Sequence, residues 1–441
     1  NYSPELNPTL SFSRYLQSPA WRGYRVLGFA SDSEQADIFR SAGFSLLDSF
    51  LPAWIINQFF YFVSMAIGSL SIASLTKQLL KNSRLKRYAN WGYLFGGIMY
   101  FTTLWTMWLF YQNMAPYIVN FGFLPLLLLF IYKYSKEDSW KNLLYIFLSS
   151  LLFTATSIIS TLFLVDLVFI VLFTLFVHFS SRYGRKREIK NVFATLTILI
   201  VTQLFWILPF VKYTLTTSSD IVDSYVNRTI TSTIIDQETS SQTLANSARF
   251  YNRTLFEQSG DKYVFPMADV FSGYDFYKVL GLFPAILSII GIAFGIAKKN
   301  FKLVFWFIIG LGSLFLIKVL NPPLGNIFEW VQENIPLFKQ VFRWPFSKLG
   351  EVYLICLTIL STFGAVYMIQ FLSSFFSKKI FKKLCILISF FVLCTSQLIY
   401  SEYVFRGYIF PERAIVNLPS EYYELEKYLE ENDSSGRIYY A

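Results

Sequence analysis

Long apolar segments recur along the chain and are separated by short polar ones. Crossing about 30 Å of hydrocarbon as a helix takes roughly 20 residues. Ten segments come near that length, at about residues 53–75, 89–111, 117–134, 142–157, 160–179, 192–212, 278–297, 302–319, 347–371 and 381–400. The stretch 142–179 is too long for one helix, and we divide it at Thr154–Thr161, where Ser and Thr cluster. The pattern predicts an all-α integral membrane protein, a polytopic helical bundle.

The polar connections between these segments fall into two sets. Five of them are rich in Lys and Arg, at residues 77–87, 133–141, 182–190, 298–302 and 378–383. All five lie on one side under the predicted topology, and the positive-inside rule makes that side cytoplasmic. The formal net charge of +10 is therefore explained by membrane orientation rather than by nucleic-acid binding. We expect a multi-pass protein of the plasma membrane with its long loops outside.

The opposite side carries the long polar segments. The predicted organisation has a first external loop with interfacial helices, two blocks of about six and four spans, a large external loop between them, and the start of an external soluble domain. These parts are residues 1–52, 53–212, 278–400, 213–277 and 401–441. Within them we expect a flexible cover at 214–243, an amphipathic helix from Pro419, and a strand at 437–440. A chain that begins in an external loop needs a preceding span, so we expect this sequence to be a fragment cut at both ends.

Several kinds of chemistry find no support. Cys356, Cys385 and Cys394 lie inside apolar spans without paired spacing, which favours packing roles. The single histidine, His178, ends a span and argues against a His-based metal site or a Ser-His-Asp triad. The sequence also lacks a P-loop, so ATP-driven transport has no support.

The first external loop holds the acidic candidates. Several acids near several arginines suit a reaction that removes a proton beside an anionic donor. The candidate bases are Glu5, Asp32, Glu34 and Asp37, and the candidate substrate-binding cations are Arg22 and Arg25. An ordinary solvated loop would look similar. Residues 31–37 also precede an amphipathic stretch, so helix capping is an alternative role for these acids.

Two further cations flank the entry to a span. Arg343 and Lys348 lie in the segment 342–348, where Pro345 suits the first turn of a helix. Cations at this interface could bind a lipid-linked phosphate, because Arg offers paired donors to phosphate oxygens. The alternative is snorkelling of both side chains toward water. In the large external loop, aromatic residues alternate with carboxylates, as a sugar-binding surface requires.

The order of these features resembles the membrane domain of GT-C glycosyltransferases that use polyprenyl-phosphate sugars. The nearest group is that of the α-(1→3)-arabinofuranosyltransferases. The resemblance rests on four segments: Asn7-Pro8, Leu51-Pro52-Ala53-Trp54-Ile55-Ile56-Asn57, Gln203-Leu204-Phe205-Trp206-Ile207-Leu208-Pro209 and Phe342-Arg343-Trp344-Pro345-Phe346-Ser347-Lys348.

The resemblance implies a GT-C-type fold with an acid of the first external loop as general base. The family places this acid close to the end of the first span, so Glu5 or an acid before Asn1 would match, with the acids at 32–37 as the other choice. The resemblance also implies that the lipid phosphate lies against basic residues. A divalent metal ion accompanies it in some members, although no residue here is assigned as a ligand.

We therefore expect a glycosyltransferase that moves a sugar, arabinofuranose in the nearest group, from a polyprenyl-phosphate donor to a glycan or lipid acceptor of the cell envelope. The main alternative is a transporter of lipids or lipid-linked glycans. Asp166, inside a span, supports that alternative, whereas Glu351 lies at a span start. No internal repeat supports a transporter. A non-catalytic membrane scaffold is the third reading.

Overall fold

The structure is a computed structural model of the chain. It describes residues 8–17, 21–22, 29–30, 33–112, 114–180, 185–223, 225–256, 258–259, 262–263, 265, 267–335, 338–407 and 419–431. Glu5, Arg25 and Asp32 lie outside the described residues, as does the strand expected at 437–440.

Within the described residues, eight helical segments are long and apolar enough to cross a membrane. Each contains a run of the length that a bilayer requires. Seven are single helices and the eighth joins α7 to the 3-10 helix η3: α3 (Ala53–Lys81), α6 (Ala115–Lys136), α7 (Trp140–Phe153) with η3 (Thr154–Ile158), α8 (Ser160–Phe179), α9 (Arg185–Asp223), α13 (Asp275–Ala297), α17 (Pro345–Ser374) and α18 (Lys379–Tyr400). The prediction of an all-α membrane protein is confirmed at this level, and η3 confirms the division of residues 142–179.

The other two predicted spans are shorter or broken. Residues 302–319 form α14 (Lys302–Ile317), and residues 89–111 form α4 (Ala89–Phe101) and α5 (Leu104–Gln112). A break in an apolar environment leaves backbone carbonyls without partners. Here side chains compensate: Thr106 donates to the carbonyl of Tyr100 at 3.0 Å, and Tyr403 donates to the carbonyl of Thr103 at 2.8 Å.

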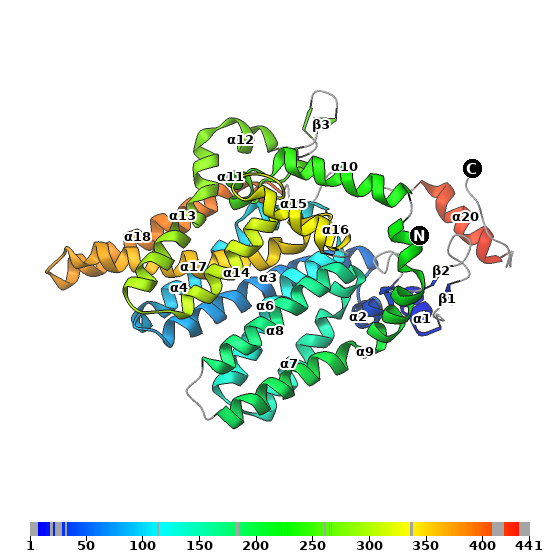
Figure 1. Ribbon diagram of the computed structural model, residues 1–441, viewed down its shortest axis with the longest axis horizontal. Helices are drawn as coiled ribbons and strands as arrows, with labels where there is room; N and C mark the ends of the chain where they lie inside the picture. Colours follow the sequence, from blue (N-terminus) through cyan, green and yellow to red (C-terminus); the bar gives the residue numbers. More distant parts are fainter. Residues whose placement is uncertain are drawn as a thin grey trace.

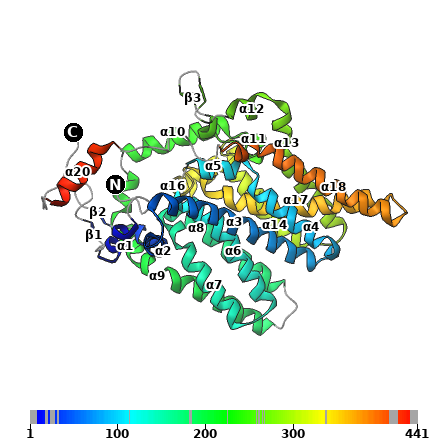
Figure 2. The same ribbon diagram turned by 180° about the vertical axis from the view of Figure 1, so that it is seen from behind.

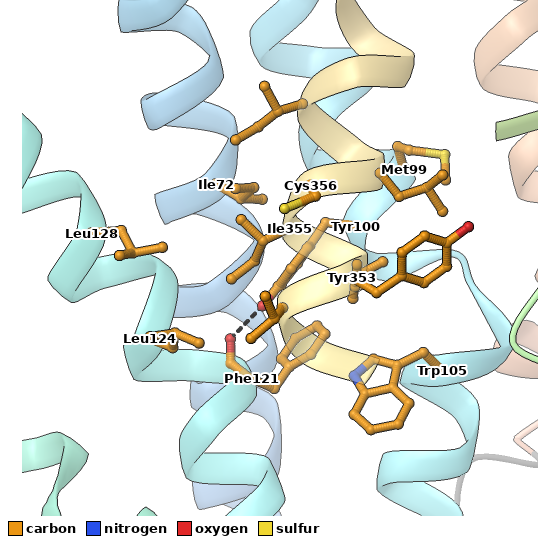
Figure 3. Close-up of a cluster of buried hydrophobic side chains, with 14 of the residues drawn as sticks. Ile72, Met99, Tyr100, Trp105, Phe121, Leu124, Leu128, Tyr353, Ile355 and Cys356 are labelled. Carbon is orange, nitrogen blue, oxygen red and sulfur yellow. Dashed lines mark hydrogen bonds between the residues drawn. The ribbon is translucent and has the colours of Figure 1, made fainter. Parts of the chain in front are cut away.

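Helix α17 is the centre of the bundle. In its apolar window 94% of the residues are buried, against 28% in α18, which protrudes at the left of Figure 1. Figure 3 shows side chains from α3, α4 and α6 closing around it, among them Ile72, Met99 and Leu124. On another side α13 approaches so closely that a Cβ on Gly364 would lie 1.9 Å from the carbonyl oxygen of Leu287. Small residues permit such contacts between membrane helices.

The short elements lie mainly at one end of the bundle, which we call the loop-rich side. Helices α3, α6, α8, α13 and α17 begin there. In Figure 1 α10, α15 and α16 lie toward the upper right, while the α3–α4, α13–α14 and α17–α18 connections lie at the left and lower left. Figure 2 shows the same separation from behind. The helical elements of this side are α1 (Pro8–Gln17), η1 (Glu34–Asp37), α2 (Ile38–Asp48), α10 (Tyr225–Ser241), α11 (Leu244–Ala248), η4 (Arg253–Phe256), α12 (Ala268–Gly273), α15 (Gly325–Asn334), α16 (Phe338–Val341), α19 (Glu402–Phe405) and α20 (Ser420–Glu431).

The remaining elements are small. One antiparallel pair joins β1 (Trp21–Arg22) to β2 (Phe29–Ala30), and a second joins β3 (Gln258–Ser259) to β4 (Lys262–Tyr263). The 3-10 helix η2 (Lys86–Tyr88) connects α3 to α4.

The prediction of a flexible cover at 214–243 was wrong for most of this segment, because α9 continues to Asp223 and α10 follows from Tyr225. The amphipathic helix expected after Pro419 is confirmed as α20.

Candidate functional site

Lys348 lies near the start of α17 on the loop-rich side. Pro345 occupies the first turn of this helix, where a missing N–H costs no hydrogen bond, and the chain turns inward from α16. The Lys348 side chain is 6% exposed, and its ammonium group donates to the carbonyl of Val341. Among the described residues it forms no ion pair with a carboxylate. Snorkelling to water is therefore the wrong description of Lys348.

Arg343 stands next to this lysine. It is half-buried, directly before α17, and close enough to act on the charge of Lys348. Two neighbouring cations repel each other, and burial raises the cost of charge. An anion near Lys348 would offset the cost of burying its charge, and the sequence predicted a lipid-linked phosphate as the ligand of Arg343 and Lys348.

Glu351 lies one helical turn deeper than Lys348. It is 1% exposed, and the indole Nε1 of Trp105 donates to its Oε2 at 2.7 Å. The Tyr100 hydroxyl contacts its other oxygen and also lies 2.8 Å from the carbonyl oxygen of Phe121, the bond drawn in Figure 3. A hydroxyl has only one proton. Both contacts of Tyr100 are satisfied when it donates to Phe121 and a protonated Glu351 donates to it.

Asp166 on α8 is a second buried acid. It is fully buried, and neither carboxyl oxygen has a hydrogen-bond partner among the described residues. Glu351 is close enough for like charges on the two acids to repel each other, and the carboxamide of Asn120 on α6 lies near the Asp166 carboxyl, although the two side chains do not meet with hydrogen-bond geometry. Both polar atoms of Asn120 are also buried without partners in that part of the chain. Asp166 and Asn120 therefore form a pair of neighbouring buried polar side chains, which is rare inside a span and marks them as functional candidates.

These groups lie at a common depth. Asp166 and Glu351 are each six residues beyond the first residue of their helix, Ser160 and Pro345, and Asn120 is five beyond Ala115. At 1.5 Å per residue they lie roughly 8–9 Å below the helix starts, with Lys348 roughly 5 Å below. The candidate site is therefore a layer of polar groups in the first two turns of α6, α8 and α17.

The acids predicted in the first loop are only partly described. Asp37 is 1% exposed, and both of its oxygens accept hydrogen bonds from Arg40, each at 2.7 Å. It occupies the N-cap position of α2 without a side-chain cap bond, so the capping role was wrong for this residue. Arg40 thus occupies one acceptor site on each oxygen and favours the charged carboxylate over the protonated one. Its role as a base stays a prediction.

The element that carries Asp37 adjoins the polar layer. Helix η1 packs against η3, where Ser33 donates to the carbonyl of Ile158 at 2.9 Å, and α8 begins two residues later. Glu34 lies in the same 3-10 helix, and Arg22 lies in β1. The structure thus brings η1 next to the start of the helix that holds Asp166.

Sequence reasoning undervalued Asp166 and Glu351. It assigned Asp166 to the transporter alternative and Glu351 to a span boundary. The available signal was an acid within an apolar helix, which is expensive unless it has a function. Their shared depth, and the contacts of Glu351 with Tyr100 and Trp105, depend on tertiary packing.

A third acid lies outside the spans, on α10. Glu238 has its Oε2 buried without a partner among the described residues. Burial raises the pKa of Glu238 to about 7, although Asn252 and Arg253 act in the opposite direction. Nearby, Asn321 holds the end of α10 by donating to the carbonyls of Thr239 and Gln242.

No family model, no curated protein and no solved structure matches the chain. The GT-C resemblance therefore stays a prediction. The described residues contain no group of three or more His, Cys, Asp or Glu side chains placed to hold a metal ion, and metal dependence also stays open.

Proposed function

We propose that this chain is a membrane glycosyltransferase that takes a sugar from a polyprenyl-phosphate donor and transfers it to a glycan or lipid acceptor of the cell envelope. The observation that carries the proposal is Lys348, a buried ammonium group without an ion pair in the described chain, beside Arg343. Its depth of roughly one helical turn suits the phosphate of a lipid whose tail remains in the hydrocarbon.

The reaction requires a leaving-group site and a base. An acceptor hydroxyl oxygen forms a bond to the anomeric carbon of the donor sugar while the bond from that carbon to the phosphate oxygen breaks. Lys348 and Arg343 stabilise the charge on the departing polyprenyl phosphate. The hydroxyl proton passes to a carboxylate, for which the first-loop acids Glu5, Asp32, Glu34 and Asp37 remain the candidates.

Donor binding tests the proposal without requiring turnover. A photoactivatable polyprenyl phosphate would be cross-linked to the wild-type chain and to Lys348→Gln in membranes. Lys379→Gln is the control, because Lys379 is an exposed lysine at the far end of the bundle. We expect about a tenfold loss of binding in Lys348→Gln, equivalent to roughly 1.4 kcal/mol, and none in the control. Equal labelling of all three proteins would contradict the proposal.

Asp166 supports a second candidate, a transporter of lipids or lipid-linked glycans. An acid that is fully buried inside a span without a partner in the described chain is typical of ion-coupled pathways. Movement of a fluorescent lipid-linked glycan across proteoliposomes would distinguish the two functions. Transport that is lost in Asp166→Asn, together with no sugar transfer by the wild type, would favour this second candidate.

A further inference from the structure

Helix α15 exposes apolar side chains although it is too short to cross a membrane. Its ten residues run from Gly325 to Asn334 between the loop-side ends of α14 and α17. Trp330 is 59% exposed and Ile327 is 44% exposed. They are three residues apart and therefore adjacent on the helix surface. Leu324, just before the helix, is also exposed.

The other two faces of α15 have different characters. Phe328 and Gln332, four residues apart, are buried against the protein. Glu329 and Glu333 form a third face that is exposed and acidic. A helix with separate apolar, acidic and protein-facing sides fits the boundary between lipid and water.

The buried face of α15 leads directly to Lys348. The ring of Phe328 lies 5.7 Å from that of Phe338 on α16, and Phe338 lies 4.6 Å from Phe342. Between these two positions, Val341 supplies the carbonyl that accepts the ammonium group of Lys348. Displacement of α15 would therefore displace the segment that carries the cations.

We propose that α15 lies flat in the interface of the leaflet on the loop-rich side, with Ile327 and Trp330 in the lipid and Glu329 and Glu333 in water, and that this contact positions Arg343 and Lys348. The occupant of the apolar face is lipid because α15 follows seven residues after the apolar helix α14, whose exposed Ile308 and Leu311 also suit a lipid environment. Tryptophan also prefers this depth. The lipid contact of α15 does not depend on the proposed function. The positioning role for Lys348 does rest on the proposed function.

Cross-linking from two positions on one helix tests the placement. A photoreactive amino acid would replace Trp330 in one form of the chain and Glu329 in another, both in native-like bilayers, because Glu329 is the acid farther around the helix from Ile327 and Trp330. We expect lipid adducts from position 330 and few or none from position 329. Equal lipid adducts from both positions, or protein adducts alone from position 330, would overturn the placement.

Donor binding tests whether the lipid contact of α15 positions Arg343 and Lys348. We expect Trp330→Ser to reduce cross-linking of the photoactivatable polyprenyl phosphate about tenfold, and the matched Glu333→Gln variant to retain it. Unchanged binding in Trp330→Ser, or an equal loss in both variants, would overturn the positioning role. Failure of the proposed function is distinguishable, because the wild type would then bind no polyprenyl phosphate while lipid adducts at position 330 would persist.

Discussion

At the scale of single residues, the site is governed by the cost of burying polar groups. Glu351 has partners for its carboxyl oxygens, whereas Asp166 and Asn120 have none among the described residues. Buried groups with hydrogen-bond partners hold a structure together, whereas those without partners remain able to bind a further group. We therefore assign Glu351 a large structural contribution and leave Asp166 as the group more open to a functional partner.

Substitution of Glu351 tests its structural contribution. Glu351→Leu leaves the buried Trp105 indole N–H unpaired, at about 1–3 kcal/mol, and removes one of the two partners of Tyr100, which keeps its bond to the Phe121 carbonyl. In Glu351→Gln the amide oxygen accepts from Trp105 and the amide nitrogen donates to Tyr100. Unfolding in detergent should show a large loss of stability in Glu351→Leu and a small one in Glu351→Gln. Equal stability of the two variants would contradict this assignment.

Glu238 predicts a dependence of stability on pH. Its pKa is about 7 in the folded protein, against an ordinary value of 4.5, because burial favours the uncharged carboxyl. The folded state therefore binds more protons between these values. This contribution to stability is complete below about pH 4.5 and is lost as the pH rises through about 7.

The difference in melting temperature between the wild type and Glu238→Gln isolates this effect, because glutamine does not titrate. We expect the wild type to lose stability relative to the variant between pH 5 and pH 8. A difference that stays constant with pH would show that Glu238 is not buried as described.

At the scale of elements, the sequence predicted apolar helices well and polar ones poorly. The ten apolar segments correspond to helices because hydrophobic length alone specifies a span. The break between α4 and α5 was missed, since it depends on Thr106 and on Tyr403, about 300 positions away in the chain. Helix α10 was missed because its Ser- and Thr-rich sequence has low intrinsic preference for helix, and tertiary contacts such as Asn321 hold its end.

The contact between α13 and α17 provides a test of helix packing. In Gly364→Ala the new Cβ would lie 1.9 Å from the Leu287 carbonyl oxygen, and a backbone atom cannot rotate away. The helices must separate, at a cost on the order of 1–3 kcal/mol. Gly312→Ala on α14 is the control, because no atom lies within 4 Å of its added Cβ. Unfolding in detergent should show a lower free energy of unfolding for Gly364→Ala and no change for Gly312→Ala. Equal stability of the two variants would argue against this contact.

At the scale of the whole molecule, the basic connections and the candidate site lie at opposite ends of the bundle. The basic connections predicted from the sequence join the ends of α3, α6, α13 and α17, away from the polar layer that contains Lys348. The sequence identified Arg343 and Lys348 because they break the apolar pattern at a span entry. It could not show that Lys348 is buried, or that η1 adjoins η3 at the start of α8, since both depend on how distant segments pack.

The most direct test of the account is transfer of radiolabelled sugar from a panel of polyprenyl-phosphate donors by the protein in membranes. Wild type would be compared with Lys348→Gln and with Lys379→Gln, after normal insertion of all three has been verified. We expect product from at least one donor with the wild type and with Lys379→Gln, and loss of product with Lys348→Gln. No product from any donor, or equal product from all three proteins, would contradict it.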